Sequence, residues 1–344
     1  MAAPSGKSCE APQTGWVSPR SVFGIRFETM ARPSLLSTLS TEGKSVFIMP
    51  SETLHITVYR HSVFYSPLIA TIAAGFLREE GLDATYFPKP RERNQYEMFR
   101  LGEIDIMQAA VSTSWDPLSK GIRDIPLHFA QINQRDGFFI AGRPTGRPFE
   151  WKQLEGARLL ADHAQQPFAM LKYGLHLKRV DWNRVQMINA GSPEEMDAAF
   201  RAGTGDFVHL QGPAPQQLEK DGIGKIVAAL GEVIPPVAFS SLMAMRDFMD
   251  TAKAKAFMRA YRRALRFVIE SPADRVAEVE VDFFPGVSRD VLAASISRYQ
   301  KLGNWRLDPA ITREQYEVAL DVFLHAGIFK ERFPFEDVVV PPPA

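Results

Sequence analysis

A seven-residue segment of this chain occurs twice, and the two copies constrain how the chain can fold. FRLGEID, at Phe99–Asp105, returns 101 residues later as FRAGTGD, at Phe200–Asp206. In each copy the phenylalanine belongs to the apolar face of a helix, and the glycine favours the left-handed backbone that ends a helix. The aspartate can hydrogen-bond the turn that follows. We interpret both aspartates as structural. The repeat could have arisen by duplication, or the same helix-ending residues could have been acquired independently in the two places.

Strands and helices alternate around both copies, which is typical of crossover connections and a mostly parallel sheet. A further strand and four helices follow them. The sequence therefore predicts an α/β fold of two lobes, each a mostly parallel sheet flanked by helices, with a helical C-terminal section. The expected strands are 54–59, 82–87, 104–110, 125–132, 137–141, 157–162, 184–188, 207–210, 225–230 and 237–245, and the C-terminal helices are 251–269, 273–281, 288–302 and 312–328.

Local signals predict two of the helix boundaries closely. Ser192 is expected to be an N-cap, with Pro193 at the first helical position and Glu195 completing a capping box. Earlier in the chain, an apolar face repeats through 67–79, and Gly81 is expected to end that helix.

Composition excludes several classes of function. Lys+Arg and Asp+Glu are both 40 in 344 residues, so the chain lacks the net positive charge of a nucleic-acid binder. The single cysteine, Cys9, excludes intramolecular disulfides and thiolate metal sites. The seven histidines are not spaced as metal ligands are. The sequence also contains no run of about eighteen apolar residues, the length needed to span a bilayer. We therefore expect no metal, no cofactor, no nucleic acid and no transmembrane segment.

The N-terminal fifty residues differ from the rest. Residues 1–50 are rich in Ser, Pro and Gly and have no continuous apolar stretch of the kind that a secretory signal needs. We expect either a disordered extension or sequence that precedes a start at Met49.

Polar loops follow the predicted strands of both lobes. Ligands of open parallel sheets bind where such loops meet helix N-termini, at the carboxyl ends of the strands. Loops from two facing lobes would form a cleft for a small molecule. The candidate contacts are Arg60, His61, Tyr65, Ser66, Gln108, Ser112, Thr113 and Trp115 from one lobe, His163, Gln165, Gln166, His209 and Gln211 from the other, and Ser240 on the returning strand.

Some of these side chains suit particular parts of a ligand. Arg60 could pair an anionic group bidentately, and backbone N–H groups at Ser112–Ser114 could hold an oxyanion. Tyr65 and Trp115 suit a flat or apolar ligand body.

Five segments, in this order and spacing, give the chain a family resemblance. They are GFLREEGLD (Gly75–Asp83), LGEIDIMQA (Leu101–Ala109), LEGARLLAD (Leu154–Asp162), AGTGDFVHLQGPAPQQLEKDGIGKIV (Ala202–Val227) and AFMRAYRRALRFVIESPADRVAEV (Ala256–Val279). The chain resembles type 2 periplasmic solute-binding proteins, in the branch with aliphatic-sulfonate-, taurine- and nitrate-binding proteins and the thiamine-pyrimidine synthases.

The resemblance implies a two-lobed clamp that closes on its ligand by hinge motion. Lobe 1 would comprise 51–138 and 236–344, and lobe 2 would comprise 139–235. The implied function is capture of a small organic, sulfonate- or carboxylate-like anion for an ABC-type permease. Such a protein would act as a bacterial periplasmic monomer, although no signal peptide is readable and a cytoplasmic location is the alternative.

Enzymes and ligand sensors share this fold and are the competing interpretation. Thiamine-pyrimidine synthases carry a substrate-donating histidine after the third strand and a CCCFC motif, whereas this chain has AAVSTSW there and one cysteine. A decarboxylase or desulfinase stays open, because His61 and His163 could act as acid and base.

Overall fold

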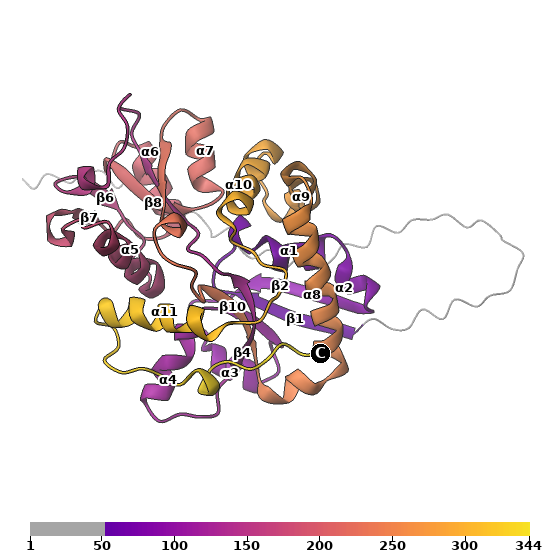
Figure 1. Ribbon diagram of the computed structural model, residues 1–344. Coiled ribbons are helices and arrows are strands. Elements are labelled where there is room, and N and C mark those ends of the chain that lie inside the picture. The colour runs from indigo at the N-terminus through magenta and orange to yellow at the C-terminus, as the bar shows by residue number, and fades with distance from the viewer. Residues whose placement is uncertain (1–51) are drawn as a thin grey trace, which may run out of the picture.

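The computed structural model describes residues 52–344, so the expectation for residues 1–50 lies outside the described residues. Over the described range the chain forms two five-stranded sheets flanked by helices and then a helical C-terminal section (Figure 1). The predicted α/β architecture of two lobes is confirmed. We call the sheet that contains the first strand, with its helices, lobe 1, and the other sheet with its helices lobe 2.

In lobe 1, four strands run in one direction and β10 runs against them. β1 is parallel to its neighbours β2 and β3, whereas β10 is antiparallel to β3 and β4. The strand order is β2 (Leu82–Pro88), β1 (Glu52–Val58), β3 (Ile106–Ala109), β10 (Ser240–Ala244) and β4 (Leu127–Asn133), with helices α1 (Ser66–Ala73), α2 (Phe76–Glu79), α3 (Gln95–Arg100) and α4 (Trp115–Ser119).

Lobe 2 repeats this plan. β6 is parallel to β7 and β8, and β5 stands antiparallel between β8 and β9. In each sheet the antiparallel strand is the first one after the chain crosses from the other lobe. The order is β7 (Gln186–Ile188), β6 (Arg158–Leu160), β8 (Phe207–Gln211), β5 (Phe138–Gly142) and β9 (Lys225–Ala229), with helices α5 (Gln165–Leu177), α6 (Pro193–Arg201) and α7 (Ala214–Lys220).

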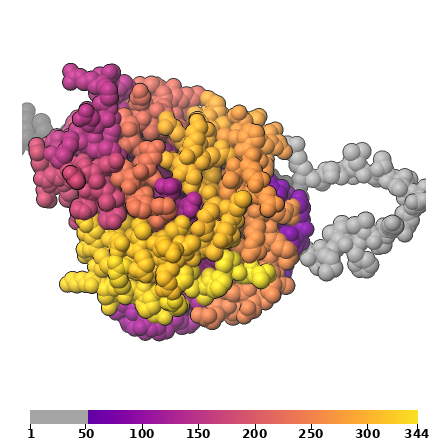
Figure 2. Space-filling model, in the orientation of Figure 1, coloured from indigo at the N-terminus to yellow at the C-terminus, as the bar shows by residue number. Residues whose placement is uncertain are grey.

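The C-terminal helices join the two lobes. α8 (Ala252–Glu270) packs on α1 and α2, and α9 (Ala273–Glu280) packs on α1 and on α10 (Arg289–Leu302). α10 lies beside α7, and α11 (Arg313–His325) lies beside α5, so this section touches both lobes (Figures 1 and 2). Within residues 52–344 no helix, not even the long α8, has both the length and the hydropathy needed to cross a bilayer.

The expected helix boundaries met different outcomes. Ser192 accepts from the Glu195 backbone N–H and the Glu195 carboxylate accepts from the Ser192 N–H, so the predicted capping box is confirmed. The prediction of a single helix over 67–79 is wrong. Gly75 adopts φ 80° and divides that stretch into α1 and α2, although the apolar face continues past it.

The repeated segment has the same structure in both lobes. Phe99 and Phe200 are buried, and the glycine three residues after each donates its N–H back to the phenylalanine carbonyl at 3.0 Å. The aspartates then hydrogen-bond the neighbouring strand rather than their own turn. Asp105 Oδ2 accepts from the His55 N–H at 2.7 Å, and Asp206 Oδ2 accepts from the Arg158 N–H at 2.9 Å. Each aspartate therefore fixes the register of two parallel strands.

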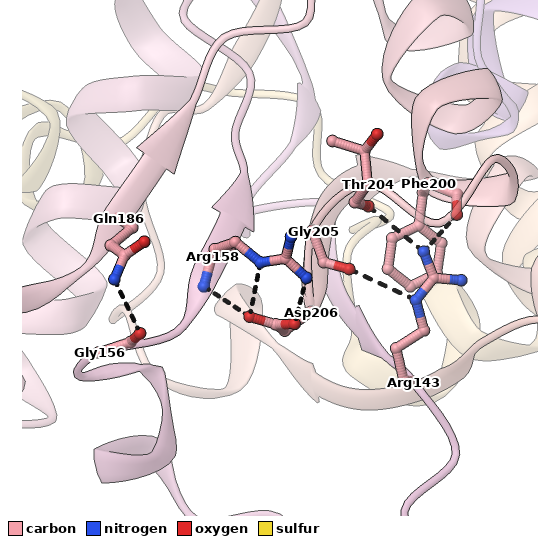
Figure 3. A network of polar contacts seen from close by, with 8 residues as sticks. All are labelled: Arg143, Gly156, Arg158, Gln186, Phe200, Thr204, Gly205 and Asp206. Atoms are coloured by element: carbon pink, nitrogen blue, oxygen red, sulfur yellow. Dashed lines mark hydrogen bonds and ion pairs between the residues drawn. The ribbon is translucent and has the colours of Figure 1, made fainter.

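Lobe 2 adds two arginines to this arrangement (Figure 3). The Arg158 guanidinium also pairs with Asp206, Nη2 to Oδ1 at 2.9 Å. Arg143 lies over the Phe200 ring at 3.8 Å and donates to the carbonyl of Thr204 at 3.3 Å and of Gly205 at 3.4 Å. The end of α6 is therefore held by backbone acceptors and a cation–π contact.

Replacing Asp105 with alanine is expected to lower the free energy of unfolding by about 1–2 kcal/mol, because the His55 N–H loses a charged acceptor. The same change at Asp206 should cost about 1 kcal/mol or less, because its side chain is 44% exposed and the interaction is screened by water. Urea denaturation followed by circular dichroism measures both. Asparagine retains an acceptor oxygen, so a loss as large in Asp105→Asn as in Asp105→Ala would contradict the backbone-acceptor role.

Candidate ligand-binding site

Loops that follow strands of both lobes meet between the sheets. In lobe 1, Val58 at the end of β1 is in register with Gln108 near the end of β3, so the loops after these strands start side by side. In lobe 2, Leu160 is in register with Val208 in the same way. The expected convergence of strand ends is therefore present in each sheet.

An ion pair connects the two lobes at this place. Arg60 Nη1, from the loop after β1, lies 2.5 Å from Asp162 Oδ2, from the loop after β6. The Asp162 side chain is only 5% exposed, and its Oδ1 accepts from the Ala164 N–H at 2.9 Å. Asp162 was not among the predicted contacts, although it directly follows a buried strand beside the predicted His163. Its proximity to Arg60 depends on how the lobes face each other.

His209 is buried in the same region. Its side chain is fully buried, neither ring nitrogen has a hydrogen-bond partner, and its ring stacks on Phe138 with centroids 4.3 Å apart. Burial lowers the pKa of His209 to about 3, with a smaller upward influence from Asp162 and a downward one from Arg60. The imidazole is therefore neutral at pH 7 and offers one free donor and one free acceptor.

A chain of polar side chains crosses from one lobe to the other. Gln108 accepts from the Tyr59 N–H at 3.1 Å and donates to Ser240 Oγ at 2.8 Å. Burial raises the pKa of Tyr65 to about 12, and the neighbouring side chains of Gln211, from lobe 2, and Ser240 oppose this rise. Four of the predicted contact residues therefore lie in one group.

Backbone groups also close the lobes on each other. Ser62 Oγ donates to the Gly212 carbonyl at 2.7 Å. The Tyr299 hydroxyl, from α10, accepts from the Gly212 N–H at 2.8 Å and donates to the Gly137 carbonyl at 3.0 Å. These residues were not predicted, because a glycine carbonyl and a distant helical tyrosine give no local signal.

Two further predicted residues lie at the rim of this region. Gln166 donates to the carbonyl of Phe239 at 2.8 Å, in the second crossing between the lobes. His163 is half-buried, stacks on Phe168 and lies 2.8 Å from the Ala161 carbonyl through Nδ1. Gln165, the neighbour of Gln166, is exposed.

The remaining candidates of lobe 1 make no side-chain contact with the group around Arg60, Asp162 and His209. Trp115 is fully buried in lobe 1, donates to the Tyr316 hydroxyl at 2.9 Å and cannot wall a cleft. Ser66 is fully buried, 2.8 Å from a Glu280 oxygen. His61 contacts Tyr86 and the Phe283 carbonyl. Ser112 is buried and Thr113 half-buried at the end of β3.

The lobes are in contact where the site is expected. Two of the cavities on the described part of the chain, of about 280 and 360 Å³, are lined by residues other than Arg60, Asp162 and His209. Because Asp162 is nearly buried and His209 is fully buried, a ligand could reach them only if the Arg60–Asp162 contact opened. Over residues 52–344 no three His, Cys, Asp or Glu side chains are grouped to hold a metal ion.

Known proteins share this fold. YtlA of Bacillus subtilis (strain 168), a protein named for a binding role, is 28% identical over 283 residues, which are 81% of this chain and 85% of YtlA. The ligand-binding component of an ABC-type import system from Staphylococcus aureus, solved with zinc bound, superposes with a TM-score of 0.66 at 18% identity, covering 85% of this chain and 97% of that one.

The alkanesulfonate-binding protein SsuA from Xanthomonas axonopodis pv. citri, solved with MOPS, gives a TM-score of 0.63 at 16% identity and covers 85% of this chain and 99% of that one. These structures establish the periplasmic-binding-protein fold and its helical C-terminal part, as the sequence predicted. The family model described as NMT1/THI5 like matches residues 64–275, more than half of the chain. The chain therefore belongs to the NMT1/THI5-like family.

Proposed function

We propose that this protein captures a small organic ligand between its two lobes, holds a sulfonate- or carboxylate-like group of that ligand at Arg60, and delivers it to an ABC-type permease. The observation that carries the proposal is the meeting of polar groups from both lobes: Arg60 with Asp162, and Ser62 Oγ with the Gly212 carbonyl. A ligand bound there would touch both lobes and so couple binding to closure.

The connections between the lobes suit a clamp that opens. The chain crosses between the sheets twice, through residues 134–137 and 230–239. At the rim, Lys220 on α7 lies 2.9 Å from Asp290 on α10, and both side chains are largely exposed. Exposed ion pairs contribute about 0–1 kcal/mol, so this contact resists opening only weakly, and the buried contacts of Ser62 and Tyr299 with Gly212 are the ones that opening must break. A ligand would shift the balance between open and closed forms by the difference between its affinities for the two forms.

The names of similar proteins support the transport half of the proposal. Solved neighbours are described as a ligand-binding component of an ABC-type import system and as an alkanesulfonate-binding protein. By analogy we propose action outside the cytoplasmic membrane, as a monomer beside a permease. Under this proposal the ligand is released unchanged, which separates it from a decarboxylase, desulfinase or sensor.

A thermal-shift screen of sulfonates, carboxylates and pyrimidines is expected to find a ligand that raises the melting temperature. Arg60→Ala and Gln108→Ala should each lower the affinity for that ligand by about tenfold or more, because a hydrogen bond to a charged group in a closed site is lost. Calorimetric titration of the ligand found in the screen gives the two affinities.

Arg246→Ala is the matched control, because Arg246 is exposed on lobe 1 away from the cleft residues. If stabilisation survives unchanged in both Arg60→Ala and Gln108→Ala, the ligand binds elsewhere. Mass spectrometry of the ligand after incubation tests the alternative, since a ligand that is consumed would favour an enzyme.

A further inference from the structure

Two exposed histidines face each other outside the proposed ligand site. All seven histidines of the chain lie within residues 52–344, and five of them are buried or half-buried. The other two are His176, in the last turn of α5, and His325, at the end of α11, and their ring centroids are 4.4 Å apart. Within residues 52–344 these rings contact each other and the Tyr173 ring, and neither takes part in a hydrogen bond. Their nitrogens are therefore available to a ligand.

The two histidines are attached to different lobes. His176 is part of α5, a helix of lobe 2, and α5 lies beside α11 (Figure 1). α11 is fixed to lobe 1, because its Tyr316 hydroxyl accepts from Trp115 Nε1 at 2.9 Å and its Phe323 ring packs on the Trp115 ring with centroids 5.1 Å apart. The histidine pair is therefore a contact between lobe 2 and a helix that is fixed to lobe 1.

Both helices start at the second crossing between the lobes and carry their histidines far from it. Near the start of α5, Gln166 donates to the Phe239 carbonyl at 2.8 Å, and near the start of α11 the Gln315 carbonyl accepts from the Ala238 N–H at 2.9 Å. Each histidine is separated from that contact by about 15 Å of helix. A change in the angle between the lobes at this crossing would therefore move one imidazole relative to the other.

The pair opens onto the cavity of about 360 Å³. Burial, His176 and Lys172 each lower the pKa of His325, so both neighbours lie within electrostatic reach of it. The carboxylate of Asp181 in the same cavity opposes the charge of Lys172. The polar and aromatic residues that line the cavity are Lys172, His176, Asp181, Trp182, Asn183 and His325.

Two imidazoles without hydrogen-bond partners suit a transition-metal ion. Imidazole nitrogen is a usual ligand of Zn²⁺, Ni²⁺ and Cu²⁺, whereas Mg²⁺ and Ca²⁺ prefer oxygen. Two imidazoles on one ion, with bonds of about 2.0–2.1 Å, bring their nitrogens to about 3 Å from each other. Rings whose centroids are 4.4 Å apart on exposed side chains can reach that separation by rotation about their side-chain bonds. Water would fill the other coordination positions.

We propose that His176 and His325 bind a divalent transition-metal ion, Zn²⁺, Ni²⁺ or Cu²⁺, that bridges lobe 2 and the C-terminal section. The site has two protein ligands rather than three, lies outside the proposed ligand site and does not depend on the proposed function. Because the ion binds both rings only while α5 and α11 lie side by side, it stabilises the arrangement of the lobes in this structure. Sequence spacing could not indicate the site, since the two helices are far apart in the chain.

Calorimetric titration of ZnCl₂, NiCl₂ and MgCl₂ into the full chain tests the proposal. The protein carries no histidine tag, is freed of metal with a chelator and is dialysed to pH 7.5. Zn²⁺ and Ni²⁺ should each bind one ion per chain, and Mg²⁺ should not bind. His176→Gln and His325→Gln should each lower the affinity for Zn²⁺ by about tenfold or more. The double variant should bind little more weakly than either single variant, because one imidazole alone cannot chelate the ion.

Two further variants separate chelation from other effects. His55→Gln removes a half-buried histidine of lobe 1, whose Nδ1 lies 2.9 Å from Thr85 Oγ1, and should leave the affinity for Zn²⁺ unchanged. Lys172→Gln removes a positive charge from the cavity and should raise that affinity about twofold or more. Circular dichroism verifies that each variant is folded.

Hydrogen exchange tests whether the ion bridges the lobes. Zn²⁺ should slow amide exchange in the last turns of both α5 and α11 in the unmodified protein, and in neither helix of the two single variants. Slower exchange in only one of the helices would overturn the bridge. Unchanged Zn²⁺ affinity in both single variants, Mg²⁺ binding as tight as that of Zn²⁺, or no binding of Zn²⁺ and Ni²⁺ would each overturn the site.

Discussion

Replacing Gly137 with alanine is expected to lower the free energy of unfolding by about 2–3 kcal/mol, a large loss for a single added methyl group. The new Cβ would lie less than 3.0 Å from three atoms of the Phe64 ring. That ring is fully buried, and the Phe64 carbonyl accepts from Asn133 Nδ2 at 2.7 Å and from Trp305 Nε1 at 3.1 Å, so the residue cannot easily move aside. Urea denaturation followed by far-ultraviolet circular dichroism measures the loss.

A matched glycine separates steric overlap from backbone strain. Gly121 has φ 77° and open space around its Cβ position, so Gly121→Ala should cost only about 1 kcal/mol of strain. Gly137 has no such positive φ, and its cost should come from Phe64 alone. Phe64→Leu in the Gly137→Ala background should therefore destabilise less than the sum of the single changes. Strict additivity would contradict the overlap.

The same substitution bears on lobe closure. Gly137 lies in the first crossing between the lobes, and its carbonyl accepts from the Tyr299 hydroxyl that also bonds the Gly212 N–H. A shift of this segment would disturb the contact between α10 and lobe 2. The position couples stability to the geometry in which a ligand would be held.

Much of the fold could be predicted because its signals are local. The capping box at Ser192 and Glu195 and the glycines of the repeated segment act through residues three or four positions away. The division of the helix expected over 67–79 into two helices could not be predicted, because the apolar face continues on both sides of Gly75. Only the left-handed backbone of that glycine ends α1.

The candidate site was harder to predict for a related reason. Trp115 follows a polar loop and looks like a cleft wall, but Tyr316 and Phe333, some two hundred residues later, cover it. Asp162 and Ser62 have partners in the opposite lobe, so their roles depend on how the lobes face each other. The 101-residue offset of the repeat does carry one hint, since it aligns Gln108 with His209. Equivalent strand ends of the two lobes thus supply polar side chains to one region.

Replacing Asp136 with asparagine is expected to change how stability depends on pH. Asp136 is fully buried in the first crossing, Oδ1 accepts from the Phe138 N–H at 2.6 Å and Oδ2 has no hydrogen-bond partner. Burial raises the pKa of Asp136 from 3.8 to about 7, opposed by the Phe138 N–H. The folded state therefore binds the proton more tightly. This contribution to stability is complete below pH 3.8 and is lost as pH rises through 7, at about 1.4 kcal/mol per pH unit.

Asparagine never ionises and keeps an acceptor for the Phe138 N–H, so the variant lacks this loss. The difference in free energy of unfolding, variant minus unmodified protein, should grow by roughly 1 kcal/mol per unit between pH 4 and 7, to a total of about 3–4 kcal/mol. Urea denaturation across that range measures it. His128 and His209 also titrate differently on unfolding, since burial lowers the pKa of each to about 3, but they are common to both proteins and cancel in the difference.

The exposed Asp247 provides the control, and the difference for Asp247→Asn should be flat with pH. A flat difference for Asp136→Asn as well would mean that water reaches the Asp136 carboxyl and that the first crossing is open to solvent. The growing difference would instead show that the carboxyl is neutral below pH 7 because the crossing segment around it is dry. In that case any separation of the lobes that exposed this segment to water would also ionise Asp136 at neutral pH, because the exposed carboxyl would return to its ordinary pKa.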